Sequence, residues 1–226
     1  MKSLFIGKFV KPLLLTIIFS TTIGCSSPIA TQTEYSGFLG DYSQLTKAKS
    51  ATGHEILRWV SPKLSSNKYT SIIYTPIIYY PKAQPTDRVS LNTLNTILDY
   101  TNAQVKGALA QQLALSSQKS PHTLIFKGAI TSVNAENEGV QFYEVLPVTA
   151  VIAGTMAATG HRTQQSELFF EAELIDSETG MPVLKVVRKG YGKNLYNSQQ
   201  IITKADVKQV IDNMVTDISK FDITHR

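Results

Sequence analysis

The first 24 residues form a segment that is separate from whatever the rest of the chain folds into. Lys2, Lys8 and Lys11 give it a basic start, and a short apolar run from Leu13 to Phe19 follows. A membrane span needs about 20 apolar residues, so this run is too short to be one. A basic start, a short apolar stretch and a small residue before a cleavage point are typical of a signal peptide. The sequence therefore predicts that residues 1–24 are removed.

Cys25 is the only cysteine in the sequence and directly follows Gly24. This is the layout of a bacterial lipoprotein signal, in which the cysteine receives diacylglycerol and its amino group is then acylated, for instance with palmitate. Two or more acyl chains give stable anchoring where one chain does not. The alternative is an uncleaved amino-terminal helix with an ordinary buried cysteine, and Thr22 stands where lipoprotein signals usually carry Leu. We expect Cys25 to be the lipid-attachment residue, with the membrane as partner through its acyl chains.

The residues after Cys25 predict where the folded part lies. Lipoproteins kept in the inner membrane usually carry Asp after the cysteine, whereas this chain has Ser26. On that resemblance we expect the periplasmic face of the outer membrane. Residues 25–34 form the predicted tether, and ten extended residues reach only about 35 Å. The single periplasmic domain predicted for residues 35–226 should therefore sit close to the bilayer.

The charge of the chain belongs largely to the part that is removed. The whole sequence has 22 Lys and Arg against 17 Asp and Glu, and three of the lysines lie in the signal segment. The remaining chain has no basic run of the kind that binds nucleic acid, so we predict no nucleic-acid partner. Its length suits one domain with one sizeable core.

Hydrophobic periodicity predicts an α+β fold. Four segments alternate or are rich in β-branched and aromatic residues, as strands are, and two have apolar residues at helical spacing. The predicted strands are Tyr69–Tyr80, Thr123–Asn134, Ser166–Asp176 and Met181–Gly190, with helices in Val89–Leu113 and Lys204–Phe221. Asp87 is the expected cap of the first helix, and Thr203 with Asp206 resembles a capping box at the second. We expect a two-layer sandwich, a mostly antiparallel sheet of about four strands with two helices on one face.

One stretch does not fit this plan. Residues 146–160 are apolar, uncharged and rich in small residues, but too short for a membrane span. The segment is either a short buried helix or loop, or an exposed apolar patch that meets lipid or another subunit. Trp59 is likewise either a core residue or a binding anchor. The candidate interaction residues are Trp59, Leu146, Val151, Gly154 and Met156.

Three motifs carry a resemblance to a known family. They are SGFLGDYSQL from residue 36, RWVSP from residue 58 and EAELIDSETG from residue 171. With them the chain resembles the bacterial lipoprotein family called domain of unknown function 3313, over roughly residues 34 to 220. The resemblance implies a lipid-anchored extracytoplasmic protein with Cys25 as the acylated position, and it implies no activity. The element order also resembles small periplasmic lipoprotein domains that act as accessories to envelope machines, which is a likeness of fold only.

No residue pattern points to an enzyme. The sequence has no GxSxG elbow, HExxH motif, P-loop or cysteine nucleophile, and its histidines are far apart: His54, His122, His161 and His225. We therefore predict no catalytic residues, no metal and no cofactor. Glu171 and Glu173 share one strand face and could form an acid pair, but a solvated strand face is the favoured interpretation.

Two functions from different classes stay open. The first is a lipid-anchored binding or accessory protein of the cell envelope, with an unknown envelope protein as its partner. The second is an envelope hydrolase with an unrecognised site, which needs titratable groups that converge in a cleft. Self-association, through a sheet edge or through residues 146–160, is a third and weaker hypothesis.

Overall fold

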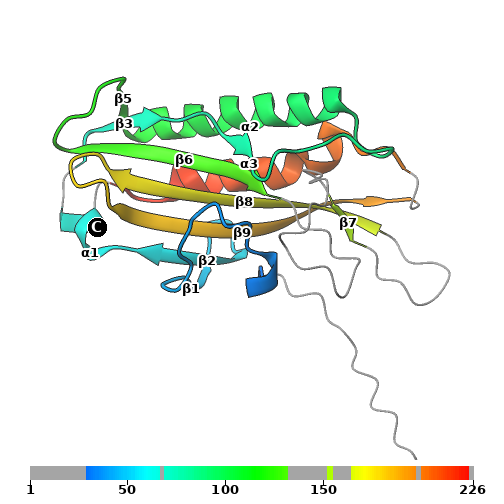
Figure 1. Cartoon of the computed structure of the whole chain (residues 1–226), viewed down its shortest axis with the longest axis horizontal. Coiled ribbons are helices and arrows are strands. Elements are labelled where there is room, and N and C mark those ends of the chain that lie inside the picture. Colours follow the sequence, from blue (N-terminus) through cyan, green and yellow to red (C-terminus); the bar gives the residue numbers. More distant parts are fainter. Residues whose placement is uncertain (1–28, 67–68, 132–151, 155–163, 197–199, 224–226) are drawn as a thin grey trace, which may run out of the picture.

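The computed structural model describes residues 29–66, 69–131, 152–154, 164–196 and 200–223. Within these residues the chain forms one mixed sheet with helices against it (Figure 1). Strands β8 and β9 are the longest and lie in the interior of the sheet. No helix in this part of the chain is both long enough and apolar enough to cross a bilayer.

The described sheet has nine strands, seven of which follow the order β1-β2-β9-β8-β6-β3-β5. Short β4 pairs with β6, and β7 pairs with the beginning of β8. The strands are β1 Thr46–Lys49, β2 Glu55–Val60, β3 Ser71–Tyr74, β4 Ile78–Tyr79, β5 Ala114–Leu115, β6 Thr123–Thr131, β7 Ile152–Gly154, β8 Gln164–Asp176 and β9 Pro182–Leu195. The pairings of β3 and β4 with β6 are parallel, as is that of β3 with β5; the other ladders are antiparallel.

The two long helices lie side by side against the sheet (Figure 1). They are α2, Leu91–Gln112, and α3, Lys204–Lys220. A short α1, Pro62–Ser66, follows β2, and a 3-10 turn, η1, spans Gln32–Glu34. Helix α2 joins β3 and β4 to β6, which is why those pairings are parallel: a strand that returns through a helix runs in the same direction as the strand before it.

This architecture corrects the predicted sheet. The α+β class stands, but the prediction of about four mostly antiparallel strands with two helices is wrong, because the sheet is mixed and has more than twice as many strands in the described residues. Strands β4, β5 and β7 span two or three residues, too few for alternation to show in a sequence. Strand β1 is almost wholly polar and exposed, so it carries no buried face to detect.

The helix caps agree with the sequence at one helix and not at the other. At α3, the Asp206 carboxylate accepts a hydrogen bond of 2.8 Å from the Thr203 N–H, which confirms the capping box. At α2, the cap is Ser90, whose hydroxyl accepts from the Thr93 N–H at 3.1 Å. The prediction of Asp87 as the cap is wrong, because the helix begins four residues later.

The main core lies between the sheet and the two helices. The inward positions of β6 and β8 alternate with outward ones, so Leu124, Phe126 and Ile130 share this face with Leu168, Phe170 and Leu174. The apolar stripes of both helices cover them, with Leu94, Ile97, Val105, Leu109, Val207, Val210, Ile211 and Met214 buried there. Burial of these stripes is the main source of stability for the two layers.

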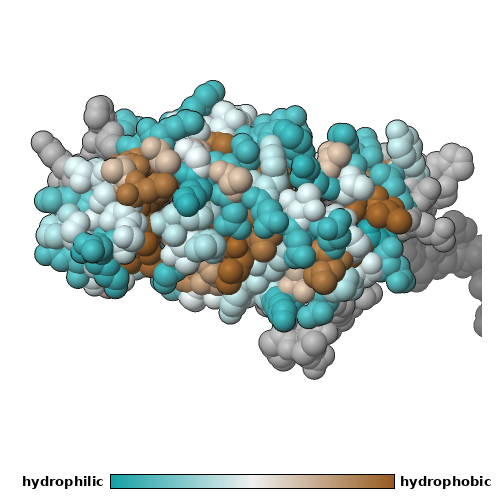
Figure 2. All heavy atoms as spheres, turned by 90° about the horizontal axis from the view of Figure 1, so that it is seen from above, coloured by the Kyte–Doolittle hydropathy of each residue, from teal (hydrophilic) through white to brown (hydrophobic). Residues whose placement is uncertain are grey.

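The outer surface over the helix side is mixed. In Figure 2, seen from above, hydrophobic side chains form separate patches among hydrophilic ones. Large apolar residues that are exposed include Leu91, Ile201 and Tyr196, the last with 94% of its surface accessible. Scattered exposed apolar residues are ordinary in a soluble domain, so no sheet-sized apolar face is left uncovered in this view.

Residues 176–180 form the turn between β8 and β9. Asp176 accepts hydrogen bonds of 2.9 Å from the N–H groups of Glu178 and Thr179, and Gly180 has a φ of +69°. Glycine suits this position because it adopts a positive φ without strain.

Helix α3 approaches β9 closely at two glycines. A Cβ at Gly190 would collide with the Val210 side chain, and one at Gly192 would collide with the Asp206 carbonyl oxygen and the Ser166 hydroxyl. The Ser166 hydroxyl donates to that carbonyl at 3.1 Å, so strand and helix are joined at this place. Glycine at these positions sets the distance between α3 and the sheet.

We predict that Gly192→Ala destabilises the protein, because the new methyl group meets helix backbone that cannot move aside. The expected loss in free energy of unfolding is about 1–3 kcal/mol. Gly107→Ala is the matched control: Gly107 lies in α2 with open space around it, so alanine should raise helix stability by about 0.5–1 kcal/mol. Urea unfolding followed by circular dichroism measures both, and equal effects of the two variants would contradict the close packing of α3.

Candidate functional site

A cavity of about 260 Å³ opens between the sheet and the carboxyl-terminal part of α3. The sheet supplies one wall through β2, β6, β8 and β9, and α3 with the residues after it supplies the other. The apolar wall residues are Ile56, Leu109, Phe126, Phe170, Ala172, Leu174, Leu184, Val186, Ile218, Phe221 and Ile223. A concave, largely apolar space with a few polar groups is the usual form of a small-molecule site.

Three basic side chains line the cavity: Lys49, Arg58 and Lys220. Arg58, from β2, lies 5.4 Å above the ring centre of Phe221, which holds its guanidinium by a cation–π contact. Lys49 ends β1 and Lys220 ends α3, and both are exposed to solvent. The cavity therefore combines apolar walls with a positively charged margin.

The acidic residues of the lining are already engaged. Asp217 on α3 forms an ion pair with the buried Arg188 of β9. Burial lowers the pKa of Arg188 to about 10, so the guanidinium stays charged at neutral pH. Glu173 alternates with Ala172 and Leu174 along β8, so its side chain points away from the cavity, toward Lys127 Nζ at 3.8 Å. Neither carboxylate neutralises the margin of the cavity.

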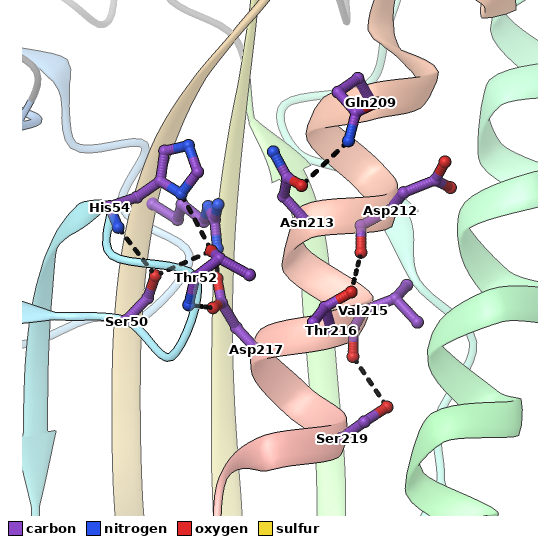
Figure 3. Close-up of polar contacts among 11 residues, drawn as sticks. Ser50, Thr52, His54, Gln209, Asp212, Asn213, Val215, Thr216, Asp217 and Ser219 are labelled. Atoms are coloured by element: carbon purple, nitrogen blue, oxygen red, sulfur yellow. Dashed lines mark hydrogen bonds and ion pairs between the residues drawn. The ribbon is translucent and has the colours of Figure 1, made fainter.

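The turn between β1 and β2 is fastened to α3 beside this cavity (Figure 3). Its Thr52 N–H donates to the Asp217 carboxylate at 2.6 Å, and the Thr52 hydroxyl lies 2.9 Å from Nδ1 of His54. Ser50 completes the turn: its hydroxyl is 3.1 Å from the Thr52 hydroxyl and accepts from the His54 N–H at 3.2 Å. We call Ser50, Thr52, His54 and Asp217 the turn clasp.

The turn clasp has the residue types of a hydrolase but not the geometry. In a catalytic triad the carboxylate binds and orients the imidazole, which in turn activates the hydroxyl. Here the Asp217 contacts that the structure records go to the Thr52 main chain and to Arg188, not to the His54 ring. The clasp therefore holds a turn in place; it does not activate Thr52 or Ser50 as a nucleophile.

A second cluster lies on the opposite face of the sheet, under residues 29–45, which we call the N-terminal strap. The strap packs Ile29, Ala30 and Leu39 against Leu57, Phe169 and Val187 of the sheet. Ile29 and Ala30 are 7% and 5% exposed, although the sequence placed them in the tether. The described chain is therefore already packed on the sheet at Ile29.

Glu171 fastens the strap. Its carboxylate accepts a hydrogen bond of 2.9 Å from the Ser36 N–H and one of 2.6 Å from the Tyr42 hydroxyl. The Tyr42 oxygen in turn accepts from the Gly37 N–H at 2.8 Å. Glu171 has no measurable exposed surface, so the prediction that it lies on a solvated strand face is wrong. A buried carboxylate is stable here because each oxygen has a donor.

Two lysines of β9 add further contacts to the strap. Lys185 Nζ donates to the main-chain oxygen of Asp41 at 2.7 Å, and Lys189 Nζ lies 3.0 Å from the Glu34 carboxylate. Glu167 is 4.0 Å from the same Lys189 Nζ, and burial raises the pKa of its carboxyl group against the opposing effect of Lys189. The strap face is therefore held by buried hydrogen bonds of Glu171 and Lys185 and by the ion pairs of Lys189, and it is not an open acid pair.

The structure places few of the predicted interaction residues. Trp59 lies half-buried on β2, opposite Lys185, and is not among the buried members of either core cluster. Gly154 ends β7, opposite Gln165. Cys25, Leu146, Val151 and Met156 lie outside the described residues. Neither Trp59 nor Gly154 lines the cavity.

Sequence reasoning missed the residues that form the margin of the cavity. Arg58 had one usable signal, a charge between the apolar Leu57 and Trp59 in a segment of strand-like composition. Lys49 and Lys220 had none, because a lysine at the end of a strand or helix is ordinary. Among the described residues no group of His, Cys, Asp and Glu could hold a metal ion.

The chain belongs to the protein family of unknown function DUF3313, whose family model matches residues 34–218. It is 49% identical over 203 residues to the uncharacterized lipoprotein YdcL of Escherichia coli K12, covering 90% of this chain and 91% of that protein. The counterpart in Escherichia coli O157:H7 matches to the same extent. Among solved structures, the PelC dodecamer from Paraburkholderia phytofirmans aligns with a TM-score of 0.37 and 9% identity, over 76% of this chain and 97% of that one. That likeness is too distant to inform assembly.

We predict that Tyr42→Phe loosens the strap, because Glu171 then loses one of its two hydrogen-bond donors inside the protein. A hydrogen bond to a buried charge contributes about 1.5–3 kcal/mol, and the free energy of unfolding should fall by that order. Tyr196→Phe removes the same hydroxyl from a side chain that is 94% exposed and should leave stability unchanged. Chemical denaturation of both variants tests this, and an unaffected Tyr42→Phe protein would contradict the role of Glu171.

We also predict a pH dependence from His54. Burial, and next the charge of Arg188, lower the pKa of its imidazole below 6.5, so folding favours the neutral ring. This contribution is present above pH 6.5 and is lost as the pH falls through the folded-state pKa. Between pH 7.5 and 5.5 the wild-type chain should therefore lose more free energy of unfolding than His54→Gln. Equal losses of free energy of unfolding in the two proteins would show that neither burial of His54 nor the charge of Arg188 lowers the pKa of this imidazole.

Proposed function

We propose that the protein is a lipid-anchored extracytoplasmic binding protein of the cell envelope, with the cavity beside α3 as its ligand site. The observation that carries the proposal is the cavity of about 260 Å³, with its apolar walls and basic margin. Such a site binds by burial of apolar surface and orients its ligand by a few charges.

The sequence and the relatives both support lipid attachment at Cys25. Cys25 ends a signal-like segment, and the curated relatives that are 49% identical over most of their length are named as lipoproteins. Ile29 is the first described residue and is already buried in the strap cluster. Four residues reach about 14 Å at most, so an acylated Cys25 would hold the domain directly against its bilayer. Ser26 in place of Asp favours the periplasmic face of the outer membrane.

The contacts favour binding over hydrolysis. Glu171 serves the strap, the carboxylate of Glu173 points toward Lys127, and Asp217 serves the turn clasp. None of these carboxylates pairs with a histidine or an uncommitted nucleophile in the described residues, as general acid–base catalysis would need. A binding or accessory role needs no such pair.

Residues 146–160 are the proposed contact with an envelope protein partner, through Leu146, Val151, Gly154 and Met156. Their apolar, small-residue composition favours close approach to another chain. Of this segment the structure describes strand β7, Ile152–Gly154, which pairs with the first residues of β8. Trp59 is a second candidate contact, because it is only half-buried.

Two substitutions test the anchor. Cys25→Ser should abolish incorporation of labelled palmitate and leave no chain of mature size that floats with membranes, because the thioether to diacylglycerol forms on the cysteine sulfur and its acyl chains supply the anchor. Ser26→Asp keeps the cysteine, so labelling should persist while the protein moves from the outer to the inner membrane fraction. Labelling of Cys25→Ser, or its retention in membranes at the mature size, would refute the anchor.

A further inference from the structure

The cavity beside α3 offers a ligand apolar walls, while the polar groups around it are already engaged within the chain. We infer that it binds an uncharged, apolar small molecule of about ten carbon atoms, such as a two-ring hydrocarbon or a short hydrocarbon chain. The ligand lies between the sheet and the carboxyl-terminal end of α3 and is held by burial of its surface. The inference rests on the proposed use of this cavity as a ligand site and names the ligand class.

The interior favours hydrocarbon over polar groups. Phe126, Phe170 and Leu174 line it from the sheet, and Ile218 and Ile223 line it from α3 and the residues after it. A polar group placed among these side chains would lose its hydration without replacement hydrogen bonds, whereas every buried methylene or ring carbon stabilises the complex. A water molecule needs two to four polar partners, so it competes poorly for such a space.

The polar side chains of the lining have partners within the chain. The Ser50 hydroxyl lies 3.1 Å from the Thr52 hydroxyl, and Asp217 accepts a hydrogen bond of 2.6 Å from the Thr52 N–H. The carboxylate of Glu173 points toward Lys127. These groups are satisfied without a ligand, so none of them requires a polar one.

The charges at the margin do not form a site for an ionic ligand. Arg58 stacks on the ring of Phe221, the acidic Asp222 follows that ring in the sequence, and all three take part in further interactions within the chain. Lys49 and Lys220 are exposed, where water and salt weaken any pairing with an anion. The same lysines disfavour a cation. Burial of apolar surface is therefore the contribution that decides binding.

The cavity is largely formed before a ligand enters. Beyond the two glycines that set the close approach of its first half, helix α3 is fastened again near its other end. There Asp217 pairs with Arg188 of β9. The side chain of Gln112, at the end of α2, donates a hydrogen bond to the Ile218 carbonyl oxygen. These contacts hold α3 beside the cavity, as is usual for small-molecule sites.

The volume limits the size of the ligand. An apolar cavity of about 150 Å³ engineered into another protein takes up benzene, which has six carbon atoms. The cavity beside α3 measures about 260 Å³, less than twice that volume. A molecule of about ten carbon atoms therefore fills it, and benzene leaves part of it empty.

Calorimetric titration of the complete mature chain carrying Cys25→Ser tests the inference, because acyl chains and the detergent that they need would compete for an apolar probe. The probes are naphthalene, benzene, 1-naphthoate and 1-naphthylmethylammonium, all below their aqueous solubility. Naphthalene should bind at one site and at least about tenfold more tightly than the other three. Benzene buries less surface, and each charged analogue brings a charge that loses hydration.

Four variants locate the site. Ala172→Leu fills the cavity from the sheet and Ile218→Trp fills it from α3, so each should weaken naphthalene binding by about tenfold or more. Ala103→Leu is the matched control, because it adds the same atoms at an exposed position of α2 outside the cavity and should not weaken binding. Lys220→Glu should change the affinity for naphthalene by less than about twofold, because the ligand carries no charge. Ile218 is only half-buried, so its variant keeps the test valid if Ala172→Leu fails to fold.

The outcomes separate this inference from the proposed function. Binding of either charged analogue as tightly as naphthalene would overturn the uncharged class and keep the cavity as a ligand site. Equal binding of benzene and naphthalene would overturn the size in the same way. Absence of binding by all four probes, or naphthalene binding that both filling variants leave unchanged, would overturn the inference together with the cavity as the ligand site. The palmitate labelling of Cys25 is a separate measurement and would stand in each case.

Discussion

The pairing of β8 with β9 is the constraint on which the rest of the structure depends. These two strands have antiparallel pairing along almost their whole length, and both of their faces are covered. On one face Phe170 and Leu174 form the core under α2 and α3 and the wall of the cavity. On the other face Glu171 and Lys185 hold the strap. When a central antiparallel pair is covered on both faces, any charged side chain on it is buried. Here both Glu171 and Lys185 have hydrogen-bond partners in the strap.

The same strand pair brings two of the motifs that resemble the family into contact. SGFLGDYSQL and EAELIDSETG are far apart in the sequence, but Ser36 and Tyr42 from the first bind Glu171 from the second. These two hydrogen bonds join the strap to the sheet at Glu171. The strap therefore lies on the strand pair whose other face forms a wall of the cavity.

The sequence predicted the elements with long, regular patterns. Helices α2 and α3 and strands β6 and β8 follow from hydrophobic periodicity within one segment. The burial of Glu171 could not be predicted, because the strap that covers it is about 130 residues away in the sequence. The cavity has the same difficulty: Arg58, Phe170 and Phe221 come from three separate elements, and their distances depend on how α3 packs on Gly190 and Gly192.

The central claim is that one strand pair carries a tightly held strap on one face and the wall of an open cavity on the other. A crystal structure of the mature chain tests it most directly. The account predicts Ser36 and Tyr42 on the Glu171 carboxylate, and an open cavity between the sheet and α3. Helix α3 collapsed onto Phe126 and Phe170 with no space between them, or a strap detached from Glu171, would contradict it.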